Sequence, residues 1–410
     1  MEKNVIVAFG GVSPEHEVSV LSAMQAISAL EETEYTVVPL YITKSGRWRS
    51  GEPLLDLENY SDLDPLIEST VPCTFSHDEL GQPVLLETEK RGFFSSPRSW
   101  PIYAVLPAFH GSEGENGAFQ GTCEMYDIPY AGSGVFASSL GMDKVKAKEL
   151  CEAHGIPVVE SVSFNESEWG QQQETVEARI DSLGFPVVVK PVSLGSSIGV
   201  LRADNRDELV EAVETSFRYD ANLLVEKAVT PLMEINCSVL GDGEEARASV
   251  CERPLGKEET LSFEDKYQSG QGGEKGMASA DRVIPADIPD DMSRRIQQLS
   301  LKIFRLFRAS GVARLDFLIQ SENNKIYFNE INTIPGSFSF YLWEESGLNI
   351  TGLMNELIDI ARRRHRRKSG RVRSYETNLL SEKAVHGIKG LKGEQNEHEK
   401  RNQTPDTRNS

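Results

Sequence analysis

The sequence lacks long hydrophobic runs and is short of positive charge, and each shortage argues against a class of protein. No run of about 18 or more apolar residues occurs, so no segment is predicted to cross a membrane. The opening MEKNVIVAFGG has a strand pattern without the apolar core and cleavage site of a signal peptide, and we expect a cytoplasmic protein. Lys and Arg total 43 against 63 Asp and Glu, a formal charge of −20. That balance argues against a nucleic-acid binder, which neutralises phosphates with basic side chains.

Cysteine is also scarce. The five cysteines are odd in number and scattered, and none is spaced as a metal knuckle or a redox pair. None has a neighbourhood typical of a nucleophile. We expect buried, reduced thiols with a structural role at Cys73, Cys123, Cys151, Cys237 and Cys251.

What the chain does contain indicates several globular domains. Its 410 residues are 39% hydrophobic, with glycine and proline distributed throughout, and exceed the usual size of one domain. The opening NVIVAFGG is an apolar strand that ends on two glycines, and a helical pattern follows behind the cap candidate Ser13. With the strand-like runs TVVPLYIT and YAVLPAFHG, residues 1–140 are expected to form a small parallel α/β domain.

Three further regions are expected. Residues 141–240 show short strands around helices, typical of an α+β unit, and residues 241–361 are expected to form a further region that ends in two strands joined by a turn. The latter contains a glycine-rich polar stretch near 269–281, expected to be a mobile loop, and a helix from Asp290 that Gly311 is predicted to stop. Residues 362–410 form a basic and then polar tail, expected to be solvated or disordered, with a nucleic-acid or membrane role as a minor alternative.

Two adjacent strands near the end of the third region carry oxygen-bearing side chains at alternate positions. Arg314 and Asp316 lie two apart on one strand, and Glu330 and Asn332 lie two apart on the next, so each pair faces one side. Asp316, Glu330 and Asn332 together form a hard-oxygen set suited to Mg²⁺. An exposed acidic sheet face is the alternative, and spacing alone leaves the two interpretations evenly balanced.

A second pattern, VVVKPVSLGSSIGV, places Lys190 at the end of an apolar strand before a turn from Gly195 to Gly199. Such a loop brings backbone N–H groups close to phosphate oxygens, and the lysine adds a positive charge. It is not a Walker loop, because the lysine precedes the glycines and a strand follows. An ordinary glycine hairpin is the alternative.

Three further segments indicate binding more weakly. Glu226 and Lys227 end an apolar strand and Glu234 follows, an arrangement that could bind an adenine edge and ribose hydroxyls, although ordinary surface residues are the better explanation from the sequence alone. Glu15 lies at a helix start, where capping is an alternative to binding. The glycine-rich HGSEGENGAFQG around His110 favours a binding loop.

Taken in order over residues 4–360, these segments resemble the D-alanine–D-alanine ligase family of ATP-grasp enzymes. Eight ordered motifs are far more specific than any single one. They are GGVSPEHEVSVLSA, HGSEGENGAFQG, MDKVKAK, VVVKPVSLGSSIGV, LLVEKAVTPLMEI, DKY, ARLDF and NEINTIPG. The resemblance implies an α/β and α+β protein with a three-domain ATP-grasp fold, whose N-terminal parallel α/β domain precedes two domains that grip ATP.

The resemblance also assigns nucleotide and metal ligands. It implies ATP and two Mg²⁺ or Mn²⁺ ions, the metals held by Asp316, Glu330 and Asn332. The implied nucleotide-binding residues comprise phosphate lysines, the glycine–serine loop, an adenine hinge, a ribose acid and a loop lysine: Lys144, Lys190, Ser196, Ser197, Glu226, Lys227, Ala228, Val229, Glu234 and Lys266.

For the substrate, the resemblance implies that Glu15 holds the ammonium of the first D-alanine, supported by Ser196 and Tyr267. Arg314 and the backbone N–H of Gly336 resemble the groups that stabilise the oxyanion of a tetrahedral intermediate. The first carboxylate would attack the γ-phosphate of ATP, and the amine of a second D-alanine would displace phosphate, which makes a peptidoglycan precursor. His110, Tyr341 and Leu342 are the remaining implied substrate residues.

Two departures from the family pattern affect the acceptor side. Tyr341 in SFSFYLWE stands where the family commonly has a serine that binds the second carboxylate, and Asn116 stands where it usually has Asp. The alternatives are another acceptor, such as D-lactate, D-serine or another small amine, or a degenerate nucleotide binder without turnover. The expected partners are D-alanine and ATP, without nucleic acid or membrane, and a homodimer is left open.

Overall fold

The computed structural model describes residues 2–89, 96–255 and 282–372, and residues up to His365 form one compact unit. Its first sheet has seven strands in the order β6-β5-β4-β3-β2-β1-β7. β1 pairs in parallel with β2 and β7, whereas β3 to β6 are added by antiparallel pairing. The predicted parallel sheet is therefore confirmed for three strands and wrong for the antiparallel extension. The strands are β1 (Asn4–Gly10), β2 (Thr36–Ile42), β3 (Trp48–Ser50), β4 (Val71–His77), β5 (Pro83–Glu87), β6 (Ser99–Pro101) and β7 (Ala104–Pro107).

The helix after β1 begins later than its serine predicts. α1 covers His16–Glu31 with Glu15 as the N-cap residue, and Ser13 lies outside it, where its Oγ accepts a hydrogen bond from the Glu15 N–H. The side chain of Glu15 makes no capping hydrogen bond, so it is directed to another partner. The other helices of this region are α2 (Leu63–Glu68), α3 (Ser112–Glu115), α4 (Ala118–Met125) and α5 (Val135–Met142), with 3₁₀ turns at Glu52–Leu55 and Leu57–Ser61.

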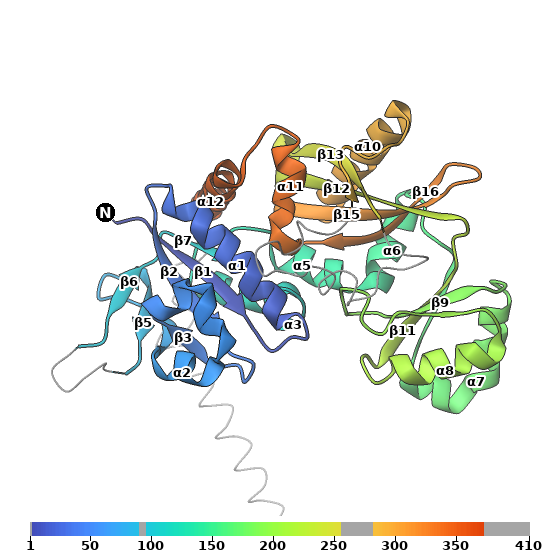
Figure 1. Cartoon of the computed structure of the whole chain (residues 1–410), viewed down its shortest axis with the longest axis horizontal. Helices are drawn as coiled ribbons and strands as arrows, with labels where there is room; N and C mark the ends of the chain where they lie inside the picture. The colour runs from blue at the N-terminus through green and yellow to red at the C-terminus, as the bar shows by residue number, and fades with distance from the viewer. Residues whose placement is uncertain (1, 90–95, 256–281, 373–410) are drawn as a thin grey trace, which may run out of the picture. The chain divides into compact units, whose positions relative to one another are not determined.

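The central sheet is antiparallel throughout, in the order β10-β9-β11-β8. Its helices lie together along one side of it in Figure 1, and their apolar residues share one core with the strands. This is the α+β unit that the sequence predicts. It comprises β8 (Ser161–Asn165), α7 (Glu166–Asp181), β9 (Val187–Pro191), β10 (Leu201–Ala203), α8 (Arg206–Ser216) and β11 (Asn222–Lys227), preceded by α6 (Lys144–Ala153).

The third sheet has five antiparallel strands in the order β14-β13-β12-β15-β16. Its core includes Ala147 and Cys151 of α6, so this helix packs with the third sheet. The prediction that Gly311 ends the helix is wrong, because α10 ends at Leu306 and Gly311 lies within β15. The elements are β12 (Leu232–Asp242), a 3₁₀ turn at Gly243–Glu245, β13 (Arg247–Pro254), β14 (Arg282–Val283), α10 (Asp290–Leu306), β15 (Ser310–Gln320), β16 (Lys325–Asn332), a 3₁₀ turn at Gly336–Ser339 and α11 (Phe340–Glu344).

The last described helix, α12, covers Ile350–Ser369. Its apolar residues from Leu353 to Ala361 are buried in the same core as β1 and α1, so the chain returns to its first sheet. Residues 362–369, which the sequence assigns to the tail, continue this helix. The predicted mobile loop at 269–281 and the tail from 373 onward lie outside the described residues.

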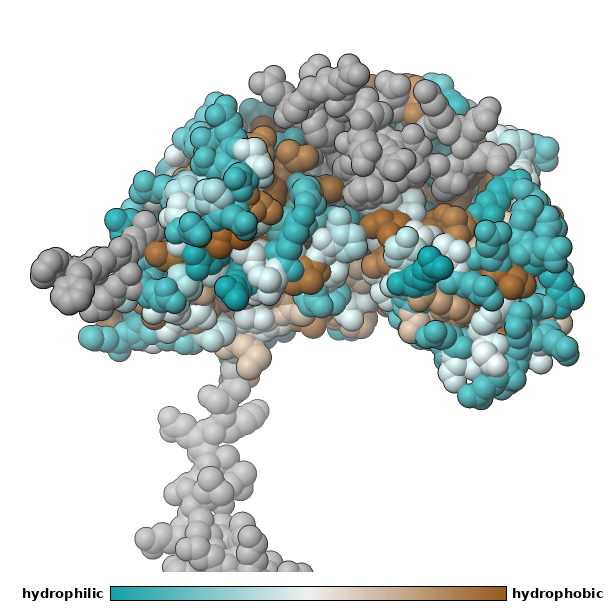
Figure 2. All heavy atoms as spheres, turned by 60° about the horizontal axis from the view of Figure 1, so that its bottom comes forward, coloured by the Kyte–Doolittle hydropathy of each residue, from teal (hydrophilic) through white to brown (hydrophobic). Residues whose placement is uncertain are grey.

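The cysteines are buried, as the sequence predicts. All five cysteines are free and buried, and burial raises the pKa of Cys73 and Cys151 to about 12, which keeps them protonated near neutral pH. On the face drawn in Figure 2, hydrophobic residues form small separate patches among hydrophilic ones. None of the helices within the described residues is long and apolar enough to span a membrane.

Candidate active site

The third sheet carries a row of polar side chains across neighbouring strands. Asp316 on β15 lies opposite Glu330 on β16, and Arg314 lies opposite Asn332, so the alternation read from the sequence brings all four to one face. Arg314 donates to both oxygens of Asp316, Nε to Oδ1 and Nη2 to Oδ2, each at 2.7 Å. Asn332 Nδ2 donates to Asp316 Oδ2 at 3.1 Å. This bidentate pair fixes the guanidinium plane.

The surroundings of Arg314 keep its guanidinium positively charged. Burial acts to lower the pKa of the guanidinium, but the adjacent Asp316 carboxylate outweighs it and holds that pKa well above its usual value. A fixed, buried cation is the kind of group that stabilises developing negative charge. Within the described ranges, no group of three or more His, Cys, Asp or Glu side chains is placed to hold a metal ion. The predicted metal set has two carboxylates and one amide, so Asn332 supplies its third oxygen.

Three lysines and one buried glutamate join the central unit to β16. Glu226 forms ion pairs with both neighbouring lysines, Oε1 lying 2.6 Å from Lys148 Nζ and Oε2 lying 2.5 Å from Lys190 Nζ. Burial alone would raise the pKa of Glu226, but the two lysines lower it to about 2. Lys190 Nζ also donates to Asn329 Oδ1 at 3.1 Å, and Lys144 Nζ lies 3.4 Å from Glu330 Oε2. The predicted phosphate lysines therefore converge beside the predicted metal ligands.

Lys148 is a residue that sequence reasoning missed. It lies one turn after Lys144 on α6, in the same motif, and its side chain is buried. Burial lowers the pKa of its ammonium, while Glu226 acts to raise it. Helical spacing of four residues could have flagged it, because such residues share one face.

The glycine–serine loop has an unusual backbone. Ser196 and Ser197 both have left-handed conformations, with φ of 52° and 58°, and Gly199 follows at 71°. Non-glycine residues adopt this region rarely and at a cost, so the surrounding contacts hold the loop. Ser196 Oγ donates to Glu15 Oε1, which links the first region to the central unit. A Cβ at Gly195 would lie 3.2 Å from Glu15 Oε2, so the glycine allows this close approach.

His110 is buried and neutral near neutral pH. Its Nε2 is 2.8 Å from Ser22 Oγ, and burial lowers its pKa to about 4. Ser22 Oγ accepts from the Ser337 N–H at 3.0 Å. The predicted loop around His110 is thereby tied to the turn that follows Gly336.

Glu115 is another residue that the sequence did not single out. Its carboxylate accepts from the Gly111 N–H at 3.0 Å and from the Ile334 N–H at 3.3 Å. Burial raises its pKa to about 7, and the nearby charge of Glu15 adds to the shift. Asn116 beside it accepts a hydrogen bond through Oδ1 from the N–H of Ala118, the first residue of α4, at 3.0 Å.

The structure describes only some of the remaining residues that are predicted to bind the nucleotide and the first substrate. The Lys227 N–H donates to Glu160 O at 3.1 Å, and the Ala228 N–H donates to Pro186 O at 2.9 Å. The carboxylate of Glu234 on β12 raises the pKa of Lys190, after the larger contribution of Glu226. Lys266 and Tyr267 lie outside the described residues.

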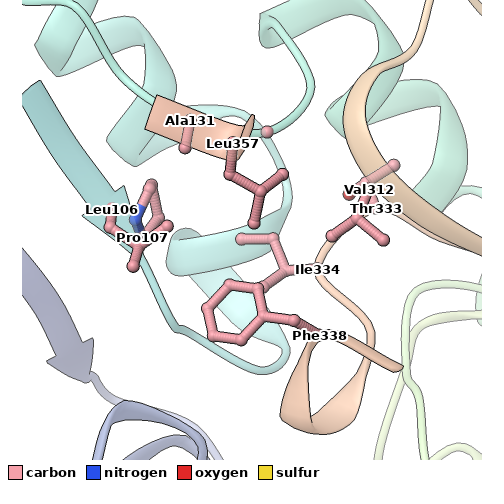
Figure 3. Close-up of a pocket in the computed structure, with 9 residues that line it drawn as sticks. Leu106, Pro107, Ala131, Val312, Thr333, Ile334, Phe338 and Leu357 are labelled. Atoms are coloured by element: carbon pink, nitrogen blue, oxygen red, sulfur yellow. The ribbon is translucent and has the colours of Figure 1, made fainter. Parts of the chain in front are cut away.

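Tyr341 and Leu342 are both buried at the start of α11. The Tyr341 hydroxyl donates to Glu252 Oε1 at 3.3 Å, so it is engaged by a protein carboxylate. The neighbouring loop borders a small apolar cavity, in which Figure 3 shows Ile334 and Phe338 extending toward Leu106. That cavity has no charged lining and cannot hold the expected ionic substrates.

Comparison with known protein families decides the assignment. The family model described as D-ala D-ala ligase N-terminus matches residues 4–133, and the one described as D-ala D-ala ligase C-terminus matches residues 150–359. The chain belongs to the D-alanine–D-alanine ligase family. The resemblance stated from eight motifs is thus confirmed, as is the ATP-grasp fold, and members of this family are ATP-dependent ligases.

Individual relatives match along nearly their whole length. A D-alanine–D-alanine ligase from Thermosipho melanesiensis is 36% identical over 377 residues, which cover 92% of this chain and 98% of that one. One from Chloroherpeton thalassium is 37% identical and covers 89% and 97%. Among solved structures, the D-alanine–D-alanine ligase from Coxiella burnetii has a TM-score of 0.75 at 30% identity, covering 93% and 99%. The VanG D-Ala:D-Ser ligase from Enterococcus faecalis has a TM-score of 0.73 at 28% identity, covering 88% and 100%.

Proposed function

We propose that this chain condenses two D-alanines at the expense of ATP, by way of a D-alanyl phosphate, and so supplies a peptidoglycan precursor. The observation that carries the proposal is the convergence of the Arg314–Asp316 pair with Lys144 and Lys190 on one site. A pure nucleotide binder would have no use for a buried arginine fixed beside the predicted metal ligands. The domains at 1–140, 141–240 and 241–361 remain part of this proposal, with α12 returning to the first core.

The donor amino acid would be held at the junction of the first region and the central unit. Glu15 would accept from its ammonium, and the hydrogen bond from Ser196 supports this by fixing the carboxylate. Ser197 and the loop backbone would approach the phosphates, together with Lys144 and Lys190. The left-handed backbone at both serines supports a loop shaped for a ligand rather than an ordinary hairpin.

The nucleotide would lie at the carboxyl end of β11. Glu226 to Val229 would contact the adenine, Glu234 the ribose, and Lys266 and Tyr267 would complete the γ-phosphate and donor ends. The donor set of Asp316, Glu330 and Asn332 fits two Mg²⁺ or Mn²⁺ ions, because all three offer hard oxygens and two face each other across the β15–β16 pair. Bound metals would neutralise the transferring phosphate.

In the second step, protein groups around the acyl carbon would stabilise the tetrahedral intermediate. Arg314 and the N–H of Gly336 would stabilise the oxyanion, a role that can lower the barrier by several kcal/mol. His110 would act through its hydrogen bond to Ser22, which also holds the turn after Gly336. No covalent enzyme intermediate is expected, in keeping with five cysteines that are all buried.

A different acceptor is the second candidate function. It is favoured by Tyr341, which stands at the acceptor side, and a relative with a TM-score of 0.73 is named as a D-Ala:D-Ser ligase. The deciding experiment measures phosphate release from ATP and Mg²⁺ with D- and L-amino acids and D-lactate, and identifies each product by mass. Condensation with D-alanine alone supports the main proposal, D-seryl or D-lactyl products support the second, and no release with any acceptor would favour a binder. The cytoplasmic location and a homodimeric state stay predictions.

A further inference from the structure

Glu115 joins the segment beside Glu15 to the segment that leads into Gly336. Its side chain is buried, and the whole residue is only 7% exposed. Oε2 accepts from the Gly111 N–H at 3.0 Å, and Oε1 accepts from the Ile334 N–H at 3.3 Å. A buried carboxylate needs such donors, because burial without partners is costly. Each oxygen of Glu115 therefore holds a different backbone segment.

Gly111 lies against the residue that would hold the donor ammonium. It has a left-handed φ of 69°, and a Cβ there would lie 2.9 Å from Glu15 Oε2. The close approach to Glu15 thus leaves no room for a side chain. Ser13 Oγ donates to His110 O at 2.7 Å, which holds the preceding residue. Glu115 therefore fixes the backbone that lies next to the Glu15 carboxylate.

Ile334 precedes the proposed oxyanion group, the N–H of Gly336, by two residues. Its side chain lies in the small apolar cavity, where Figure 3 shows it extending toward Leu106. Between Ile334 and Gly336, Pro335 has a φ of −67° that its ring restricts, so the connection is stiff. A displacement of the Ile334 backbone would therefore move the Gly336 N–H as well.

A second set of hydrogen bonds holds the same turn. The His110 ring makes a hydrogen bond with the backbone of Ile334, and its Nε2 is 2.8 Å from Ser22 Oγ. Ser22 Oγ accepts from the Ser337 N–H at 3.0 Å. The left-handed φ of 52° at Ser337 is costly, so the turn depends on such contacts. Backbone on both sides of Gly336 is thus fixed to the first region.

We propose that Glu115 is a positioning residue, which aims the Gly336 N–H at the oxyanion by holding the Ile334 N–H. This role rests on the proposed function and involves no contact with the reacting atoms. In the second step the acceptor nitrogen forms a bond to the acyl carbon, and a carbonyl electron pair moves onto its oxygen. That pair then returns, the bond to the phosphate oxygen breaks, phosphate leaves with the bonding electrons, and the nitrogen loses a proton.

Only this second step places new negative charge on the acyl oxygen. In the first step the donor carboxylate attacks the γ-phosphate and loses negative charge, so it has no developing oxyanion to stabilise. A group that stabilises a transition state alone changes the rate of the step in which that transition state forms. A displaced Gly336 N–H should therefore slow dipeptide formation and leave phosphate transfer unchanged.

Glu115→Gln tests this separation of the two steps. A glutamine has one acceptor oxygen, so it can hold only one of the two N–H groups, and its own NH₂ faces the other. At pH 8, above the pKa of about 7 that burial gives Glu115, we expect dipeptide formation to slow by about 10- to 100-fold. ADP formation in the first turnover should be unchanged. Rapid-quench single-turnover experiments with ATP, Mg²⁺ and D-alanine measure ADP and dipeptide separately.

Glu113 supplies the matched control, because it lies on the same helix, α3, with an exposed side chain. Glu113→Gln should alter neither step. If Glu115→Gln fails to fold, Glu115→Asp keeps the charge on a shorter side chain that cannot span both N–H groups, and should show the same selective loss.

Two kinds of result would contradict the positioning role. An equal fall in ADP and dipeptide formation in the Glu115 variant, or no fall in either, would overturn it while leaving the proposed function in place. A wild-type protein that forms no dipeptide from D-alanine would overturn the proposed function itself, and the role of Glu115 with it.

Discussion

At the scale of single residues, Glu115 has a charge set by its surroundings. Burial raises its folded-state pKa from 4.5 to about 7, with Glu15 and Glu330 adding to the shift. The folded protein therefore binds a proton that the unfolded chain has released between about pH 4.5 and 7. This group stabilises the fold at acid pH, and the stabilisation is lost as the pH rises through 7.

Replacing Glu115 by glutamine should remove that pH dependence. The variant keeps a neutral side chain of the same shape, so its free energy of unfolding relative to the wild type should improve by about 2 kcal/mol between pH 5 and 8. Urea unfolding at several pH values measures the difference. A constant difference across that range would mean that Glu115 is ionised in the folded protein throughout.

Lys148 gives a second prediction at this scale. It shares Glu226 with Lys190, so Lys190 can turn to a phosphate without leaving the buried carboxylate unpaired. In Lys148→Met, Lys190 must stay with Glu226, and we expect kcat/KM for ATP to fall by about tenfold, equivalent to one lost ionic hydrogen bond. Initial rates at varied ATP measure this.

The matched control for Lys148 lies on the same helix. Lys146 pairs with Glu149 and its side chain is 61% exposed, so Lys146→Met should leave the ATP dependence unchanged. Loss of kcat alone in Lys148→Met, at constant KM for ATP, would speak against a role in freeing Lys190.

At the scale of elements, the ends of helices resisted prediction more than the strands. The end of α10 was assigned to Gly311, but Arg308 adopts the left-handed φ of 53° that glycine usually supplies. Its N–H donates to Arg305 O at 3.0 Å, and the Ala309 N–H donates to Phe304 O at 2.9 Å, the two bonds of a Schellman end. A non-glycine residue in that role leaves no signal in the pattern.

The sequence likewise predicts some residues of the site and not others. Asp316 and Glu330 could be predicted because alternation within two adjacent strands fixes their face. Glu252, which accepts from the Tyr341 hydroxyl, could not, because β13 joins the row only through tertiary pairing. Glu115 became visible only when its N–H donors on two separate segments were known.

The turn before α11 is a strained element. Ser337, Phe338 and Ser339 are all left-handed, with φ of 52°, 54° and 51°. The Ser339 hydroxyl is buried and makes no hydrogen bond with the residues that the structure describes. Left-handed backbone costs about 1 to 2 kcal/mol for a residue with a β-carbon, so Ser339→Gly should stabilise the protein by about 1 kcal/mol after the added entropy of the unfolded chain. Ser339→Ala, which keeps the β-carbon, should gain less, and thermal unfolding of the pair measures the difference.

At the scale of the whole molecule, the loop after Tyr130 joins the first sheet to the third. Arg364 Nη2 of α12 donates to Tyr130 O at 3.1 Å, and the Ser310 N–H donates to Ser133 Oγ at 3.3 Å. Between these bonds, the backbones of Gly132 and Gly311 approach each other closely. A Cβ built on Gly311 would lie 2.7 Å from the Gly132 Cα, a distance that requires movement of backbone.

Two glycine substitutions separate that contact from backbone conformation. Both glycines have positive φ, 89° at Gly132 and 75° at Gly311, but a Cβ on Gly132 would meet nothing within 4 Å. Gly132→Ala should therefore cost only the left-handed penalty of about 1 kcal/mol, whereas Gly311→Ala should cost about 2 to 4 kcal/mol because it also forces the two backbones apart. Urea unfolding gives both values. Since β15 carries Arg314 and Asp316, Gly311→Ala should also lower turnover more than Gly132→Ala does at a temperature where both variants are folded. Equal free-energy costs for the two variants would mean that the loop around Gly132 and β15 can move apart without strain. The contact between Gly132 and Gly311 would then not hold the first region against the strand that carries Arg314 and Asp316.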